Sequence, residues 1–236
     1  MKSFVNNFDV VVLSPHLDDA ALSCGQHIWQ WEQEGKKIMI ITLFTKHTGY
    51  KYLPNYTKSY LKTSGFKTGD DFGAARILED IGAMKSFGVQ WEHWGLLDAG
   101  FRIYKNKKAK YPTKKSLLSA KIKNEDKKLI KTISNKLEKI NSKLFLIPFD
   151  IGAHVDHLIV KKAGEKIKGN KLYYLESPYL WQGNNFLTGL KMLKKIKSFK
   201  FGKKEKNQIL KEYTSQYHLQ VNKYFIYPEI LVSEGN

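Results

Sequence analysis

The sequence predicts an α/β protein: a three-layer, Rossmann-like, mostly parallel sheet with helices on both faces. Short runs of aliphatic and β-branched residues alternate with longer amphipathic stretches along the chain. Clusters of histidine and aspartate directly follow two of the apolar runs, and ligands bind at such strand ends in open parallel sheets. With 236 residues and no evident linker or internal repeat, residues 1–236 are expected to form one domain.

The first half of the chain shows the alternation clearly. The expected elements, in order, are a strand at 8–14, a helix at 20–34, a strand at 37–45, a helix at 72–87 and a short strand at 89–97. Residues 50–71 are rich in Gly, Tyr, Lys, Ser and Thr and lack a clear period. We expect this stretch to be a long loop near the site.

The second half continues the pattern after a basic, irregular stretch at 102–119. A helix is expected from residue 124 or 125 to 140, because five aliphatic residues recur there near a period of 3.6: Leu129, Ile130, Ile133, Leu137 and Ile140. The remaining expected elements are a strand at 143–149, a helix at 157–168, a strand at 171–175 and a tail helix around 204–217.

The charge of the chain is unusual. Lys and Arg number 40 against 22 Asp and Glu, a net of +18, and residues 102–143 carry 15 basic residues against three acidic ones. Such a segment suits an anionic partner: nucleic acid, a membrane surface or a phosphorylated substrate. The alternative, which we favour, is a solvated surface on a lysine-biased chain.

Cysteine content and hydropathy exclude several classes of protein. Cys24 is the single cysteine, which excludes an internal disulfide framework and a cysteine-built zinc site. The apolar run at 10–13 is too short to span a bilayer, and no signal-peptide pattern accompanies it. We therefore expect a cytoplasmic protein without a transmembrane segment.

Two clusters carry the chemistry. His16, Asp18 and Asp19 follow the first strand, and residues 154–157 (HVDH) follow the strand at 143–149. A catalytic zinc ion takes three protein ligands and keeps one position for water, so two histidines and one carboxylate would suffice. The remaining histidine and carboxylates would serve proton transfer and charge stabilisation.

Each residue also has a structural interpretation. Asp18 or Asp19 could cap the helix that follows. The four histidines outside the clusters are expected to be structural: His27, His47, His93 and His218. Adjacent carboxylates beside a histidine are costly unless a cation holds them, which favours a metal site for the clusters as a pair.

These clusters resemble the two signatures of the PIG-L family, also called LmbE-like proteins. VVLSPHLDDAALSCG at 11–25 is similar to the first signature, and GAHVDHLIV at 152–160 is similar to the second. The family consists largely of metal-dependent N-deacetylases of N-acetylglucosamine-type sugars. Leu17 and Val155 replace prolines of the usual pattern, and Ala20 replaces a common Glu. These departures bear on the substrate more than on the metal.

The resemblance implies a role for each matching residue. His16, Asp19 and His157 match the zinc ligands, and Asp18 matches the general base. His154 would stabilise the oxyanion or act as an acid, with Asp156 orienting it.

Two further positions match residues that reach the sugar, Arg76 and Asp98. Arg76 could instead form a surface ion pair with Asp80 at i, i+4.

The sequence thus predicts a zinc-dependent hydrolase that removes acetyl from an amino sugar, which could be phosphorylated, nucleotide-linked or lipid-linked. Fe²⁺ or another divalent ion would also suit two histidines and a carboxylate. The alternative is a basic protein that binds nucleic acid or an anionic surface without hydrolysis, which the two intact clusters disfavour.

Overall fold

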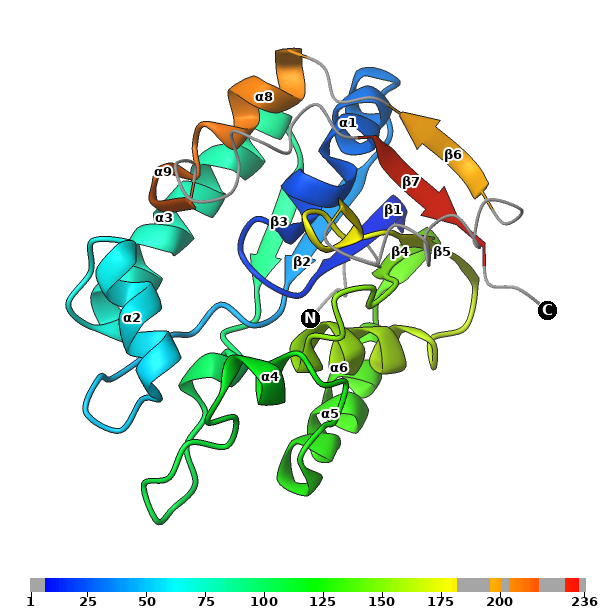
Figure 1. The fold of residues 1–236 in the computed structure, drawn as a ribbon. Helices are drawn as coiled ribbons and strands as arrows, with labels where there is room; N and C mark the ends of the chain where they lie inside the picture. The colour runs from blue at the N-terminus through cyan, green and yellow to red at the C-terminus, as the bar shows by residue number, and fades with distance from the viewer. Residues whose placement is uncertain (1–6, 182–195, 201–203, 217–227, 234–236) are drawn as a thin grey trace, which may run out of the picture.

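A mostly parallel sheet forms the centre of the molecule (Figure 1). The computed structural model describes residues 7–181, 196–200, 204–216 and 228–233. Within these ranges seven strands form one sheet in the order β3-β2-β1-β4-β5-β7-β6. The strands are β1 (Asn7–Ser14), β2 (Ile38–Thr42), β3 (Gln90–His93), β4 (Asn141–Pro148), β5 (Asn170–Tyr174), β6 (Ile196–Lys200) and β7 (Glu229–Val232). β1 to β5 pair in parallel, whereas β7 pairs antiparallel with both β5 and β6.

Helices cover both faces of the sheet. The α-helices are α1 (Asp19–Gln33), α2 (Asn55–Thr63), α3 (Gly69–Phe87), α4 (Lys114–Leu117), α5 (Lys127–Leu137), α6 (Val155–Gly164), α8 (Lys204–Leu210) and α9 (Thr214–Gln216). Short 3-10 helices occur at η1 (Ala99–Phe101), η2 (Asn124–Asp126) and η3 (Tyr179–Trp181). No helix among the described residues is long and apolar enough to cross a bilayer.

Alternate side chains of β1 build two cores. Val11 and Leu13 pack with α5 and α6, whereas Val10 and Val12 pack with α1, α3 and α8. A strand that is buried on both faces appears in the sequence as a continuous apolar run, as residues 10–13 do. The predicted three-layer α/β fold is confirmed.

The stretch at 50–71 differs from its predicted loop. α2 forms within it, with Thr57 and Leu61 buried four residues apart on one helix face. The side chain of Thr68 accepts a hydrogen bond from the Asp71 amide, so α3 begins at Gly69. The stretch does lie beside the site, as predicted, because α2 lines the cavity described below.

Several elements are shorter than predicted: β2, α5 and α6 lose residues at their ends, and β3 and the tail helix differ more. β3 ends at His93, opposite Thr42 at the end of β2. Beyond it the two segments stay joined by separate backbone hydrogen bonds and an isolated bridge between Lys46 and Leu97, without a regular ladder. The tail helix breaks into α8 and α9 at a turn after Leu210. The predicted end of the tail helix at residue 217 lies outside the described residues, as does His218.

A kink in α1 is held by the far end of the chain. Cys24 has non-helical dihedral angles (φ −145°, ψ 20°), which frees the amides that follow it. The buried carboxylate of Glu229 in β7 accepts from the Gln26 amide at 2.9 Å and the His27 amide at 3.2 Å. Lys206 of α8 donates to the same carboxylate at 2.5 Å. Glu229 thus caps the second half of α1 as a side chain at an N-terminus does.

Replacing this carboxylate tests its contribution to stability. Glu229→Gln leaves Lys206 buried without its ionic partner, so the free energy of unfolding should fall by about 3–5 kcal/mol. Urea denaturation followed by circular dichroism measures the change. Glu138→Gln, on the exposed end of α5, is the matched control and should change it by less than about 0.5 kcal/mol. Equal effects of the two substitutions would contradict the capping role.

Candidate active site

The two histidine–aspartate clusters meet where the strand order reverses. β1 and β4 are parallel neighbours, with β2 on one side and β5 on the other. In sheets of this kind the carboxyl ends at such a switch point form a crevice. Residues 16–19 follow β1 and residues 154–157 follow β4, so segments about 140 positions apart face each other there.

The first cluster is shaped by the turn between β1 and α1. Ser14 Oγ donates to the His16 carbonyl at 2.7 Å and accepts from the Ala20 amide at 3.1 Å. Asp18 has φ 117°, a left-handed backbone conformation that residues other than Gly, Asn and Asp rarely adopt. The turn therefore places Asp18 and Asp19 on different sides of the helix start, and neither acts as a side-chain cap of α1.

The second cluster lies on the first turn of α6. His154 is the N-cap residue, and its Nδ1 accepts from the Asp156 amide at 3.2 Å. Because Nδ1 accepts, the neutral ring carries its proton on Nε2. Burial, together with the neighbouring His16, holds the pKa of His154 well below its usual value. The hydrogen bond to Nδ1 and the lowered pKa both favour a neutral His154 that can donate a hydrogen bond from Nε2.

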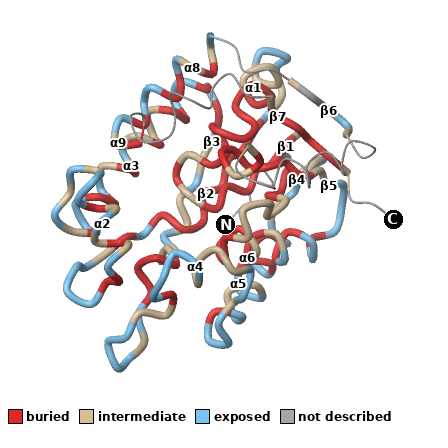
Figure 2. Tube along the Cα trace, in the orientation of Figure 1, coloured by how far each residue is buried: buried red, intermediate tan, exposed pale blue. Residues whose placement is uncertain are grey.

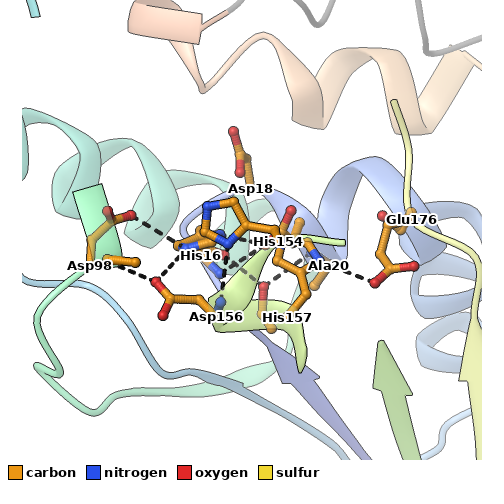
Figure 3. A network of polar contacts seen from close by, with 12 residues as sticks. His16, Asp18, Ala20, Asp98, His154, Asp156, His157 and Glu176 are labelled. Atoms are coloured by element: carbon orange, nitrogen blue, oxygen red, sulfur yellow. Dashed lines mark hydrogen bonds and ion pairs between the residues drawn. The ribbon is translucent and has the colours of Figure 1, made fainter. Parts of the chain in front are cut away.

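Asp19 joins the clusters. Its Oδ2 lies 3.1 Å from His16 Nδ1 and 3.2 Å from His157 Nε2. Figure 3 shows the rings of His16, His154 and His157 gathered together, with Glu176 beyond His157. Burial alone would lower the pKa of His16, but hydrogen bonds to Asp156 and Asp19 outweigh it and raise that pKa to about 9. Burial likewise opposes ionisation of Asp19, yet His157 and His16 hold its pKa well below the usual range. The structure thus brings together the three residues expected to bind zinc.

The arrangement fits a divalent cation. His157 Nε2 is buried and makes no hydrogen bond within the described residues, although it faces Asp19. Its Nδ1 lies 3.1 Å from the buried Glu176 carboxylate, an arrangement that orients a metal-binding imidazole. Ligand atoms of a tetrahedral site with bonds of about 2.1 Å lie about 3.4 Å apart, close to the spacing around Asp19. Ring nitrogens of His16, His154 and His157 also gather within 4.8 Å of one another.

Asp18 and Arg76 form a separate pair. Arg76 Nη2 lies 2.9 Å from Asp18 Oδ2, and both side chains line the cavity. Burial raises the pKa of Asp18 to about 6, against the opposing charge of Arg76. The alternative pairing of Arg76 with Asp80 is wrong: Asp80 is buried against His93 at 2.7 Å and accepts from the Tyr213 hydroxyl at 2.7 Å.

Asp156 contacts other partners than the predicted one. Its carboxylate reaches His16 Nε2 at 3.2 Å, the Ala99 amide at 2.9 Å and Arg102 Nη2 at 2.5 Å. The backbone amide of Asp156, and not its carboxylate, holds His154. The carboxylate therefore orients His16, across the β1/β4 junction.

Two contributors were not recognised in the sequence. Glu176 follows β5 directly, so its place at a strand end was an available signal. Arg102 was counted among the surface charges of the basic segment, yet it is buried between Asp156 and Asp126. Nothing local in the sequence distinguishes it from the lysines that follow.

A cavity of about 620 Å³ opens over these groups. Its walls include side chains of α2, α3, α4 and α9, with Tyr56 and Tyr60 among the aromatic ones. Asp98, which follows β3, lies 3.3 Å from His16 Nε2 and 3.9 Å from His47 Nε2. His47 is buried between the rings of Phe72 and Phe101 and also lines the cavity, so its expected structural role does not exclude contact with a ligand.

The other histidines outside the clusters are structural, as predicted, where they are described. His27 is fully buried against Glu229 at 2.9 Å, and His93 pairs with Asp80.

Residues 11–168 match the PIG-L family, described as GlcNAc-PI de-N-acetylase. The chain belongs to this family. Membership confirms the resemblance on which the site residues were predicted, and it confirms the prediction of an enzyme that hydrolyses an N-acetyl amide.

Relatives of this PIG-L protein share most of its length. The 2'-N-acetylparomamine deacetylase of Niallia circulans is 27% identical over 192 residues, covering 74% of this chain and 69% of the relative. The zinc-inhibited form of teicoplanin deacetylase Orf2 is a structural neighbour with a TM-score of 0.71 and 19% identity, covering 96% of this chain and 99% of its own. A40926 pseudoaglycone deacetylase Dbv21 matches with a TM-score of 0.62 and 22% identity, covering 90% and 84%.

The buried ion pairs of Arg102 with Asp126 and Asp156 predict how its replacement changes the stability of the protein. Arg102→Met leaves Asp126 and Asp156 without this ionic partner, so the free energy of unfolding should fall by about 3–5 kcal/mol. Lys110→Met is the control, because Lys110 donates to the same Asp126 at 2.6 Å from a more exposed position. It should cost less than half as much in urea denaturation. A larger loss for Lys110→Met would show that the network is anchored at the surface.

Proposed function

We propose that this protein is a zinc-dependent hydrolase that removes the N-acetyl group from an N-acetylglucosamine-type amino sugar. The observation that carries the proposal is a set of three metal-donor side chains next to a carboxylate that lines the cavity. The donor set of His16, Asp19 and His157 lies beside Asp18, a carboxylate whose pKa is raised to about 6. A metal site next to a carboxylate of that pKa suits hydrolysis of an unactivated amide near neutral pH.

Zinc is the proposed ion because two imidazoles and one carboxylate are a common catalytic zinc set. His16, Asp19 and His157 would hold it, and Glu176 would fix the orientation of His157. Bound zinc supplies Lewis acidity toward the acyl oxygen and toward water. Fe²⁺ is the alternative ion for the same donors.

The protein's own groups then divide the proton transfers. Asp18 takes a proton from the attacking water, whose hydroxyl part bonds to the acyl carbon. When the C–N bond breaks, the same carboxyl returns the proton to the leaving nitrogen, so acetate and a free amine result. Arg76, 2.9 Å from Asp18, holds the carboxylate in position through the cycle.

His154 supports the charge that develops on the acyl oxygen. As a neutral ring with its proton on Nε2, it donates a hydrogen bond without itself being an acid. Arg76 and Asp98 are proposed to contact the sugar or its substituent, since both line the cavity.

An acetate-release assay tests the function directly. The purified protein should carry a divalent metal and release acetate from N-acetylated amino sugars, and a chelator should abolish turnover until zinc is added back. The assay should include phosphorylated and nucleotide-linked sugars. Chelator-insensitive release, or none from any sugar by a metal-loaded enzyme, would refute the proposal.

Two substitutions separate metal binding from proton transfer. Asp18→Asn should fold and keep the metal, because Asn tolerates the left-handed backbone of position 18. Its turnover should fall by about 10²–10⁴-fold, the usual contribution of a general base.

His157→Ala should instead lose both metal and activity, since it removes a donor. Metal content by atomic emission and acetate release measure the two effects. If Asp18→Asn loses its metal while Asp19→Asn retains it, the roles of the aspartates are exchanged.

A further inference from the structure

The structure divides the basic segment at 102–143 into groups with different surroundings. Arg102 and Lys110 form ion pairs with Asp126 inside the protein. The exposed lysines of α5 lie on the solvent side of that helix, whose other side packs on the sheet. A third group lies on the hairpin that an isolated bridge between Ile103 and Ala109 closes. This last group forms no ion pair with an acidic side chain within the described residues.

The hairpin meets a second basic loop. Lys107 Nζ lies 5.2 Å from the ring centre of Tyr52, so residues 103–108 contact the loop that precedes α2. Both segments extend from the same side of the molecule (Figure 1) and are exposed (Figure 2). We define the lysine–tyrosine rim as the side chains of Tyr50, Lys51, Tyr52, Lys58, Ile103, Lys105, Lys107, Lys108, Lys114 and Lys115.

The rim combines charge with exposed apolar groups. Neither residues 46–62 nor residues 102–115 contain an Asp or Glu. Four large hydrophobic side chains are exposed among the described residues, and three belong to the rim: Tyr50 at 46%, Tyr52 at 37% and Ile103 at 39%. Lysines surrounding exposed aromatic and aliphatic side chains are typical of surfaces that bind an anionic membrane interface.

The rim borders the mouth of the cavity. α2 follows its first loop and lines the cavity through Tyr56, Thr57 and Tyr60. α4 follows the hairpin and lines the cavity through Lys114 and Leu117. A flat partner seated on the rim would therefore lie beside the cavity entrance.

We propose that the lysine–tyrosine rim docks the protein on an anionic phospholipid surface. The lysines face the headgroup phosphates, while Ile103 and the two tyrosines enter the interfacial layer. Docking places the cavity entrance at the membrane, where an amino sugar carried on a lipid would be presented.

Two features favour a lipid surface over nucleic acid. The rings of Tyr50 and Tyr52 already carry lysine ammonium groups from Lys58, Lys51 and Lys107 at 5.2–5.6 Å, so a stacked base would have to displace them. Ile103 offers no stacking face for a base but suits an acyl interface.

Vesicle sedimentation tests the proposal with the intact protein. Binding to vesicles of equimolar phosphatidylcholine and phosphatidylglycerol should exceed binding to phosphatidylcholine alone and should weaken as salt is raised. A combined Lys105→Gln, Lys107→Gln and Lys108→Gln variant should lower the partition coefficient by about 100-fold. The matched variant on α5, with Lys127→Gln, Lys128→Gln and Lys131→Gln, should lower it by less than about 5-fold. Equal losses would show that net charge alone binds lipid and would overturn the proposal.

Apolar variants and a nucleic-acid probe complete the test. Ile103→Ser should weaken vesicle binding several-fold, whereas Leu78→Ser, 70% exposed on α3, should not. Tighter binding of the wild type to a single-stranded oligonucleotide than to the vesicles, lost in the hairpin variant, would assign the rim to nucleic acid and overturn the proposal. Vesicle binding requires no turnover, so Asp18→Asn should dock normally. The inference can therefore fail or stand apart from the proposed hydrolase.

Discussion

The contact of one aspartate with two histidines organises this molecule. Asp19 Oδ2 lies between His16 Nδ1 and His157 Nε2, and it links the turn after β1 to the helix after β4. All three side chains are largely withdrawn from solvent, so each charge depends on the others for compensation. The carboxylates of Asp156 and Glu176 support this contact. Asp156 pairs with His16 and Glu176 with His157, each at the ring nitrogen that points away from Asp19.

The sequence was informative wherever a feature is encoded locally. Residues 8–14 predict a strand buried on both faces, because every position there except Asp9 is apolar or small and the run ends in a turn. The clusters at 16–19 and 154–157 were placed together because parallel strands end at one edge, and the structure brings them into contact. The family signatures assigned roles to individual residues, which composition and periodicity cannot do.

Features that depend on distant partners were not predictable. α2 has Leu61 as its one aliphatic side chain, so its buried face depends on Thr57 as well and on the elements packed against both. Arg102 resembles its lysine neighbours in the sequence, yet in the folded chain it is buried and bridges Asp126 and Asp156. The neutral state of His154 likewise follows from an amide contact and a neighbouring charge, which a sequence does not display.

The kink at Cys24 bears on the order in which this chain can acquire its native structure. The amides freed there are satisfied by Glu229, more than two hundred residues downstream. A contact of that separation carries a large loop-closure entropy and raises the contact order of the domain, which slows folding. During synthesis the N-terminal helix emerges long before its capping residue. The second half of α1 therefore gains its cap only once β7 has been synthesised, more than two hundred residues later, and until then its freed amides have no carboxylate partner.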